Sequence, residues 1–246
     1  MTGPPALEFR SVTKTYSRSH LGRTTTSRGI ADLTLMVPEG ESFGLLGLNG
    51  SGKTTTFKLA LGLLRPTAGE VRVLGRPPAD AVALAQVGFL PELPYFYTFL
   101  TPRESLRFYG RLSGLCEQDL PERIAQVLEL VGLSAHGGRR MADFSKGLVQ
   151  RVGLAQAVVH DPRLVMLDEP ASGLDPLAIK EFRDFLGSLR EKGKTLVVSS
   201  HSISELERLC DRVGILKEGR LVRTIAQREW ECAAEGLEGL FVETVR

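Results

Sequence analysis

Hydrophobic and polar positions follow two different periods along this chain, and together they predict strands alternating with helices. Apolar residues at every second position, or in short unbroken runs, are typical of strands, whereas recurrence every three or four residues is typical of helices. Strands are expected at 7–12, 30–37, 43–46, 70–74, 87–90, 163–167, 195–199, 213–216 and 221–224. Such alternation predicts an α/β fold with a mainly parallel sheet covered on both faces.

Helices are expected at 55–64, from 101 to about 112, at 121–131, at 148–159 and from 176 onward. Thr101 to Glu104 and Ser202 to Glu205 are predicted capping boxes, and Asp175 is predicted to cap the helix that begins at Pro176. The stretch 17–29 is rich in Ser, Thr, Arg and Gly, which predicts a loop.

Composition limits the binding partners and the cellular location that we expect for the protein. The chain of 246 residues has a net charge of +2, so charge gives no case for nucleic acid as a partner. Its three cysteines are scattered, which favours free thiols in a reducing compartment. No signal pattern opens the chain, and no apolar run approaches the roughly 18 residues of a membrane span. We therefore expect a cytoplasmic location, with any membrane role depending on a partner.

The run Gly47-Leu48-Asn49-Gly50-Ser51-Gly52-Lys53-Thr54 stands between a predicted strand and a predicted helix. Glycines let successive N–H groups turn toward anionic oxygens, and the helix that follows presents its positive end to them. Lys53 then reaches the terminal phosphates, and the Thr54 hydroxyl is a ligand for Mg²⁺. An ordinary glycine-rich turn is the alternative, but the complete motif and its flanks favour a phosphate loop.

Two further segments directly follow apolar strands. Asp168 and Glu169 offer a metal anchor and a group that activates water, although a solvated acidic turn is the alternative. His201 is placed to bond the γ-phosphate, although a lone histidine is more often an ordinary surface or core residue. Parallel strands end at one edge of a sheet, so we expect these segments and the phosphate loop to converge on one nucleotide.

Several spaced motifs together resemble the ATP-binding-cassette (ABC) ATPases. The segment Phe144-Ser145-Lys146-Gly147-Leu148-Val149-Gln150-Arg151 is similar to the family's signature sequence, and Ser172-Gly173-Leu174-Asp175 is similar to its D-loop. His201 resembles the switch histidine, and Tyr16 resembles the aromatic residue that stacks on adenine. The resemblance extends from about Leu7 to Thr224.

The resemblance implies a P-loop NTPase with a RecA-like, mainly parallel sheet and an N-terminal antiparallel β subdomain. It implies one ATP-binding domain over 1–246, with a helical signature subdomain at about 93–158 and a C-terminal tail at about 226–246. Two copies are expected to clamp ATP head to tail, so that Ser145 and Gly147 of one copy face the phosphate loop of the other. The implied nucleotide-binding residues are Tyr16, Gly47 through Thr55, Glu92, Ser145, Gly147 and Asp175, with Thr54 and Asp168 on Mg²⁺ and Glu169 and His201 in catalysis.

Two positions depart from the family's usual sequence. Lys146 stands where glycine is commonest, a variant similar to that of exporters of drugs, polysaccharides and organic solvents. Glu92 stands where the family's Q-loop usually has glutamine. A carboxylate at that position is expected either to bind Mg²⁺ through water or to weaken ATP binding slightly.

Two other segments keep alternative interpretations. Arg18, Arg23 and Arg28 either border the nucleotide or form a solvated hairpin tip, and we favour the hairpin tip. The aromatic run 95–100 either fills the core or forms a docking groove for a membrane partner, and the resemblance favours docking.

The leading functional hypothesis is an ATPase subunit that powers a separate transmembrane exporter. It would bind ATP and Mg²⁺ and lie against the inner face of the cell membrane through its permease partner. The alternative is a soluble regulatory ABC ATPase whose ATP-driven dimerisation controls a non-transport partner. A GTPase switch or a small-molecule kinase is a third possibility, but neither explains the signature segment or Tyr16.

Overall fold

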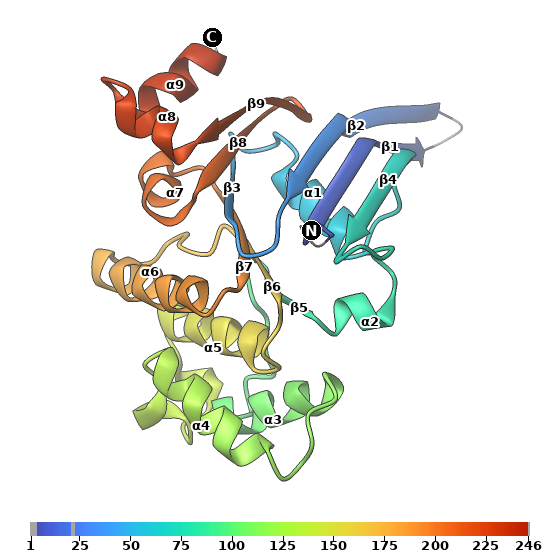
Figure 1. Cartoon of the computed structure of the whole chain (residues 1–246). Coiled ribbons are helices and arrows are strands. Elements are labelled where there is room, and N and C mark those ends of the chain that lie inside the picture. The colour runs from blue at the N-terminus through green and yellow to red at the C-terminus, as the bar shows by residue number, and fades with distance from the viewer. Residues whose placement is uncertain (1–3, 21–22, 246) are drawn as a thin grey trace. The chain divides into compact units, whose positions relative to one another are not determined.

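A computed structural model describes residues 4–20 and 23–245, and within these ranges the side chains of 18–25 are outside the description (Figure 1). The chain forms two compact units. The first combines the residues up to Leu84 with those from Thr195 onward, and the second runs from Ala85 to Lys194.

The first unit contains an antiparallel sheet of three strands. These are β1 (Leu7–His20), β2 (Arg23–Val37) and β4 (Ala68–Val73), in the order β2-β1-β4. The predicted loop at 17–29 is wrong for the described residues, because β1 continues to His20 and β2 begins at Arg23, with Ser17 paired to Thr26 and Arg18 to Thr25. The side chains of Ser17, Thr26 and Ser27 are exposed in these strands, and threonine is a good strand former.

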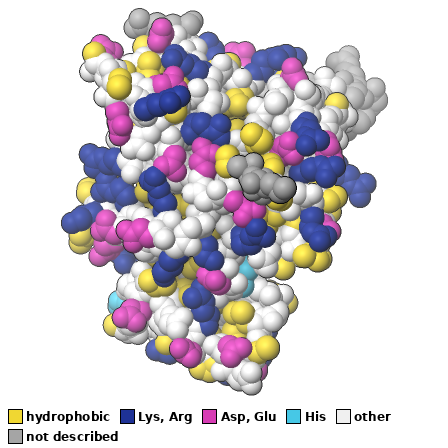
Figure 2. Space-filling model, viewed as in Figure 1, with side chains coloured by type: hydrophobic (Ala, Val, Ile, Leu, Met, Phe, Trp, Pro, Cys, Tyr) yellow, Lys and Arg dark blue, Asp and Glu magenta, His cyan; other side chains and the backbone are white. Residues whose placement is uncertain are grey.

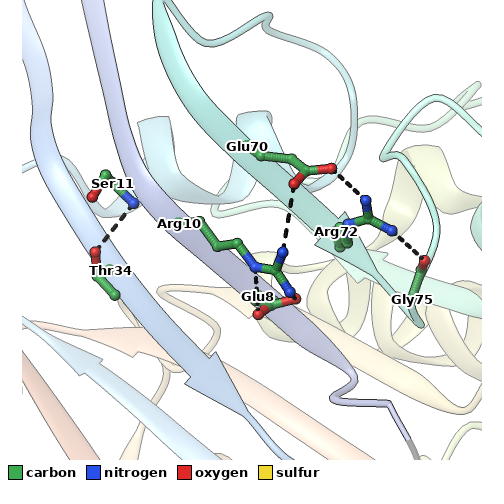
Figure 3. Close-up of polar contacts among 7 residues, drawn as sticks. All are labelled: Glu8, Arg10, Ser11, Thr34, Glu70, Arg72 and Gly75. Carbon is green, nitrogen blue, oxygen red and sulfur yellow. Dashed lines mark hydrogen bonds and ion pairs between the residues drawn. The ribbon is translucent and has the colours of Figure 1, made fainter.

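One face of this sheet is charged. Arg10 donates to Glu8 at 2.8 Å on β1, and Arg72 pairs with Glu70 at 2.7 Å on β4 (Figure 3). The Ser11 amide donates to Thr34 Oγ1 at 3.1 Å where β1 bulges. Exposed pairs of this kind stabilise little, so the sheet owes its stability to its other face, where Leu7, Phe9, Leu33, Leu35 and Val71 are buried.

The first unit also contains a parallel group of strands. Strand β3 (Ser42–Leu46) lies between β7 (Thr195–Ser200) and β8 (Arg212–Lys217), and β9 (Arg220–Ala226) pairs with β8 in the antiparallel direction. All residues of β3 and β7 are buried, as their unbroken apolar runs predict. The helices of this unit are α1 (Lys53–Ala60), α2 (Ala81–Leu84), α7 (Ile203–Leu209), α8 (Gln227–Cys232) and α9 (Gly236–Val245).

Helix α1 is shorter than predicted. It ends at Ala60, whereas the apolar pattern predicts a helix to Leu64. Gly62 turns the chain with a φ of +69°, and Leu63 is 66% exposed. The apolar residues after Ala60 therefore do not continue the buried face of the helix.

The second unit contains strands β5 (Val87–Leu90) and β6 (Leu164–Asp168), which pair in parallel. Its helices are α3 (Pro102–Leu112), α4 (Leu120–Leu130), α5 (Lys146–Val158) and α6 (Pro176–Glu191), with short 3₁₀ turns at Ser134–His136 and Met141–Asp143. Thr101 and Glu104 form the predicted capping box, and the predicted apolar face of α4 is buried. Leu112, the last residue of α3, is exposed.

The surface carries charges of both signs. On the face shown in Figure 2, Lys and Arg side chains are interspersed with Asp and Glu, in keeping with the small net charge. The three cysteines are free, as predicted. Among the described residues, no helix is both long and apolar enough to cross a membrane.

Candidate functional site

The predicted phosphate loop joins the end of β3 to the start of α1. Gly50 and Gly52 have φ values of +81° and +110°, which side chains with a Cβ rarely adopt. The Lys53 side chain is buried and turns back over the loop, donating to Gly47 O at 2.7 Å and to Leu48 O at 3.5 Å. The loop therefore curls around a single ammonium group.

The interior of this loop has the properties of an anion site. A Cβ added to Gly50 would meet nothing within 4 Å, so the backbone there is accessible to a ligand. Ser51 Oγ is buried and has no hydrogen-bond partner among the described residues. Helix α1 begins at Gly52 without a side-chain cap, which leaves its positive end available. These groups fit a polyphosphate, because it supplies the acceptors that they lack.

Tyr16 lies beside the first turn of α1. Its hydroxyl shares a hydrogen bond of 3.1 Å with Thr55 Oγ1, and Lys14 Nζ lies 5.6 Å from the ring centre. A Cβ on Gly29 would come within 2.7 Å of the Tyr16 ring, so this glycine makes room for the ring. The half-buried aromatic ring is thus next to the phosphate loop, and its stacking on adenine stays a prediction.

His201 and the phosphate loop lie at the same edge of the parallel strands. Leu46 pairs with Ser200, so Gly47 and His201 are the next residues at the carboxyl ends of β3 and β7. The predicted capping box at Ser202 is wrong, because the Ser202 side chain caps no amide. Instead, the Ser202 amide donates to Ser200 Oγ at 2.9 Å, and that hydroxyl donates to Glu205 at 3.1 Å. The Glu205 carboxylate therefore bonds to Ser200 at the end of β7, just before His201.

Asp168 and Glu169 occupy the corresponding strand end in the second unit. Both are buried, and Glu169 has a φ of +47°, which is unusual for a residue with a side chain. The Ser172 amide donates to Glu169 O at 3.1 Å and closes the turn. Because Leu90 pairs with Leu167, the exposed Glu92 lies at this same edge of β5 and β6.

Gln150 also belongs to this region, although no separate role is predicted for it from the sequence. It lies on α5, is 2% exposed, and donates from Nε2 to Pro170 O at 2.9 Å. The bond holds the turn that carries Glu169 against the helix of the signature segment. A signal was present in the sequence, since Gln150 is a polar residue on the otherwise apolar face of α5.

The signature segment forms the start of α5. Ser145 is the N-cap, and its Oγ accepts from the Leu148 amide at 3.5 Å, the limit for such a bond. The Lys146 side chain lies over Gly173, where an added Cβ would come 2.5 Å from its Nζ. Asp175 caps α6 as predicted, accepting from the Ala178 amide at 2.9 Å.

The aromatic run divides between two environments. Tyr95, Tyr97 and Phe99 are 90%, 58% and 66% exposed, whereas Phe96 is buried with its ring edge-on to Tyr109. The run is therefore not a core segment as a whole. Arg28 is exposed, and the side chains of Arg18 and Arg23 lie outside the described part of the chain.

The structure gathers the predicted site residues into two sets. Tyr16, the phosphate loop and His201 belong to the first unit. The second unit carries Glu92, Ser145, Gly147, Asp168, Glu169 and Asp175. Joint action of the two sets on one nucleotide stays a prediction.

Comparison with known proteins identifies the family of a chain with these loops. A family model described as ABC transporter matches residues 30–172, which is more than half of the chain. The chain belongs to the ABC transporter family. The match includes the phosphate loop, the ABC signature segment and the turn at Asp168 and Glu169, whereas Tyr16, Asp175 and His201 lie beyond it.

Individual ABC relatives cover most of the chain. An uncharacterised ABC transporter ATP-binding protein of Synechocystis sp. is 42% identical over 86% of this chain and 62% of its own length. The bacitracin transport ATP-binding protein BcrA of Bacillus licheniformis is 40% identical over 81% of this chain and 65% of its own length. The chain thus spans less than two thirds of the length of these two relatives.

A solved ABC structure shares the fold. It is a dimeric, post-hydrolysis state of an ATP-binding cassette bound to ADP and Pi. It has a TM-score of 0.82 and 25% identity, and the alignment covers 90% of this chain and 99% of that one. The P-loop NTPase fold predicted from the sequence is therefore confirmed.

Proposed function

We propose that this chain binds and hydrolyses ATP and drives a separate membrane exporter. The observation that carries the proposal is the glycine loop closed over Lys53, in a chain of the ABC transporter family. A loop of this geometry presents amides and an ammonium group to a polyphosphate. The names of the relatives add the transport role, since BcrA is a transport ATP-binding protein.

In this proposal the first unit binds most of the nucleotide. Gly47 through Thr55 hold the phosphates, and Tyr16 stacks on the adenine ring from its place beside Thr55. Thr54 and Asp168 provide a hydroxyl and a carboxylate oxygen, which are the ligand types that Mg²⁺ prefers. The ion, when bound, supplies positive charge to the phosphate oxygens.

Hydrolysis requires a group that takes a proton from the attacking water. Glu169 has this role in our proposal, because its carboxylate follows the strand end directly and the turn holds its backbone in an unusual conformation. Water adds to the γ-phosphorus as the bond to ADP breaks, and the products are ADP and phosphate. His201 donates to a γ-phosphate oxygen, and the exposed Glu92 interacts with the metal through water.

The second half of the site comes from another copy of the chain. Ser145 is exposed and its cap bond is long, so its hydroxyl is available to a phosphate at little cost. Gly147 lies in the first turn of the same helix, and Asp175 lies at the start of α6, where a neighbouring copy approaches. The dimeric state of the solved relative bound to ADP and Pi supports this arrangement. The whole chain, including the helical part at 93–158 and the tail from 226, then acts as one ATP-binding domain.

The exposed aromatic residues Tyr95, Tyr97 and Phe99 form the docking surface for the membrane partner. Contact with the membrane partner would remove these three aromatic side chains from water. The chain then lies against the inner face of the cell membrane. Regulation of a non-transport partner is the second candidate function. The transport names of the relatives favour the exporter.

Replacement of Glu169 by Gln tests the proposal. The purified E169Q variant is expected to bind ATP like the wild type, to lose turnover by at least about 100-fold, and to form a stable dimer with ATP. Phosphate release, nucleotide binding and size-exclusion chromatography measure the three properties. The matched control is E191Q, since Glu191 is an exposed carboxylate at the end of α6. Unchanged phosphate release in E169Q would refute the role of Glu169.

A further inference from the structure

The turn between β8 and β9 is bonded to the phosphate loop. The Gly219 amide donates to Ser51 O at 2.9 Å, and Gly219 O accepts from the Ala31 amide at 2.7 Å. Three segments that are far apart in the sequence, namely β2, the phosphate loop and this turn, are thus joined at one glycine. All three belong to the first unit.

Close packing accompanies these bonds. A Cβ on Gly219 would lie 2.9 Å from Gly29 O and 3.0 Å from the Ile30 Cα. A Cβ on Gly47 would lie 2.6 Å from Leu216 O, so the other end of the phosphate loop also touches the end of β8. Gly47 and Ser51, near the two ends of the loop, therefore contact backbone atoms of residues 216–219. A residue larger than glycine does not fit at position 47 or position 219.

The same turn is tied to the C-terminal tail. Lys217 Nζ donates to Val245 O at the end of α9 at 2.7 Å. The tail is anchored further by the Leu237 amide, which donates to Glu207 on α7 at 3.1 Å. Figure 1 shows α8 and α9 beside β8, β9 and α7. Residue 217 thus holds the tail while residue 219 holds the phosphate loop.

We propose that the turn 216–220 positions the phosphate loop, that Gly219 is the positioning residue, and that α9 steadies the turn through Lys217. The physical reason is the planarity of the peptide bond. Because the Ser51 carbonyl points at the turn, the amide of Gly52 in the same trans peptide points away from it. A bond that fixes the Ser51 carbonyl therefore also fixes the direction in which the Gly52 N–H points toward a ligand. The inference rests on the proposed function in that the ligand is a nucleotide phosphate.

The chain offers a matched pair of variants for the test. Gly219 and Gly40 share a φ of +79°, and a Cβ on Gly40 would meet nothing within 4 Å. Gly219→Ala and Gly40→Ala therefore both place a Cβ on a residue with the same positive φ, and only in Gly219→Ala does this Cβ meet the backbone of Gly29 and Ile30. ATP affinity is measured by equilibrium titration below the unfolding temperature of both variants.

Gly219→Ala is expected to weaken ATP binding about tenfold, whereas Gly40→Ala stays within about twofold of the wild type. Hydrogen exchange of residues 48–53 without nucleotide is expected to become faster in Gly219→Ala alone. Equal affinity and equal exchange in the two variants would overturn the proposal. A wild type that fails to bind ATP would refute the proposed function, while the exchange experiment would still decide the role of the turn.

The tail is tested separately by Lys217→Met. Arg228→Met on α8 is the control, because Arg228 is likewise a basic residue near the tail and is exposed. Lys217→Met is expected to weaken ATP binding about threefold and to speed exchange in 48–53, since it removes one hydrogen bond at a distance from the loop. Unchanged exchange in Lys217→Met would overturn the contribution of α9.

Discussion

The helices α1 and α5 both begin at segments predicted to face phosphate, but they begin in different ways. Helix α1 starts after Gly52, whose φ is +110°, and no side chain caps it. Helix α5 starts after Ser145, which has an ordinary extended conformation and accepts from the Leu148 amide at 3.5 Å. We call the start of α1 open, because no side chain caps it. We call the start of α5 weakly closed, because Ser145 caps it through a long hydrogen bond.

Helices α3 and α6 show what a closed start is like, whereas α4 begins without a side-chain cap. Asp175 accepts from an amide of α6 at 2.9 Å, and Thr101 and Glu104 satisfy each other's backbone groups at the start of α3. A helix with its first amides satisfied gains little from an anion, whereas an uncapped helix retains its donors for a ligand. We infer that α1 is a permanent phosphate site and that Ser145 changes partner when a second copy brings its nucleotide.

The largest expected effect comes from removing the cation at the uncapped start of α1. Lys53→Ala is expected to weaken ATP binding at least about 100-fold, because it removes a charged donor from a buried site. Lys58→Ala is the control on the same helix, since Lys58 is exposed. Equilibrium nucleotide titration measures both variants, and tight ATP binding by Lys53→Ala would refute the phosphate-loop interpretation.

The weakly closed start is tested by Ser145→Ala. This variant is expected to bind ATP as a single chain like the wild type but to lose at least about tenfold in turnover, because one donor to the phosphate is missing. The expected defect lies in the neighbouring copy's site, which makes complementation possible.

Mixtures of Ser145→Ala with Lys53→Ala distinguish action in trans from a local defect. In a mixed dimer, the loop of the Ser145→Ala copy faces the intact Ser145 of the other copy, so one whole site remains. Phosphate release is therefore expected to exceed that of either variant alone. No recovery at any mixing ratio would contradict the head-to-tail arrangement.

Local features of the fold and the site could be predicted from the sequence. The phosphate loop is encoded in eight consecutive residues with a strand before and a helix after them, so no distant contact is needed to identify it. The Thr101 capping box was predicted for the same reason. The bond from Gln150 to Pro170 and the bond from Gly219 to Ser51 join residues far apart in the chain, and a single sequence does not reveal them.

The wrong predictions have the same physical origin. Ser202 to Glu205 has the composition of a capping box, but the Glu205 carboxylate binds Ser200 at the end of the preceding strand. The segment 17–29 has the composition of a loop, but its residues find backbone partners across a long hairpin. In both cases a tertiary or cross-strand partner overrides the local preference.

The smallest expected effect comes from opening a helix start that has no predicted ligand. Thr101→Ala is expected to lower the free energy of unfolding by about 1 kcal/mol and to leave ATP affinity unchanged. The pKa of the Glu104 carboxyl lies below its usual value, mainly because the Thr101 amide donates to it. Its folded-state pKa is the lower one, so this stabilisation is present at neutral pH and is lost as the pH falls through that value.

Denaturant unfolding of Thr101→Ala at several pH values measures this effect. The difference from the wild type is expected to shrink in acid, because protonation of Glu104 weakens its bond with the Thr101 hydroxyl, which the variant lacks at every pH. A loss of ATP affinity equal to that of Lys53→Ala would show that any disturbed helix start affects the nucleotide. An affinity equal to that of the wild type would show that the start of α3 does not contribute to nucleotide binding, unlike the start of α1.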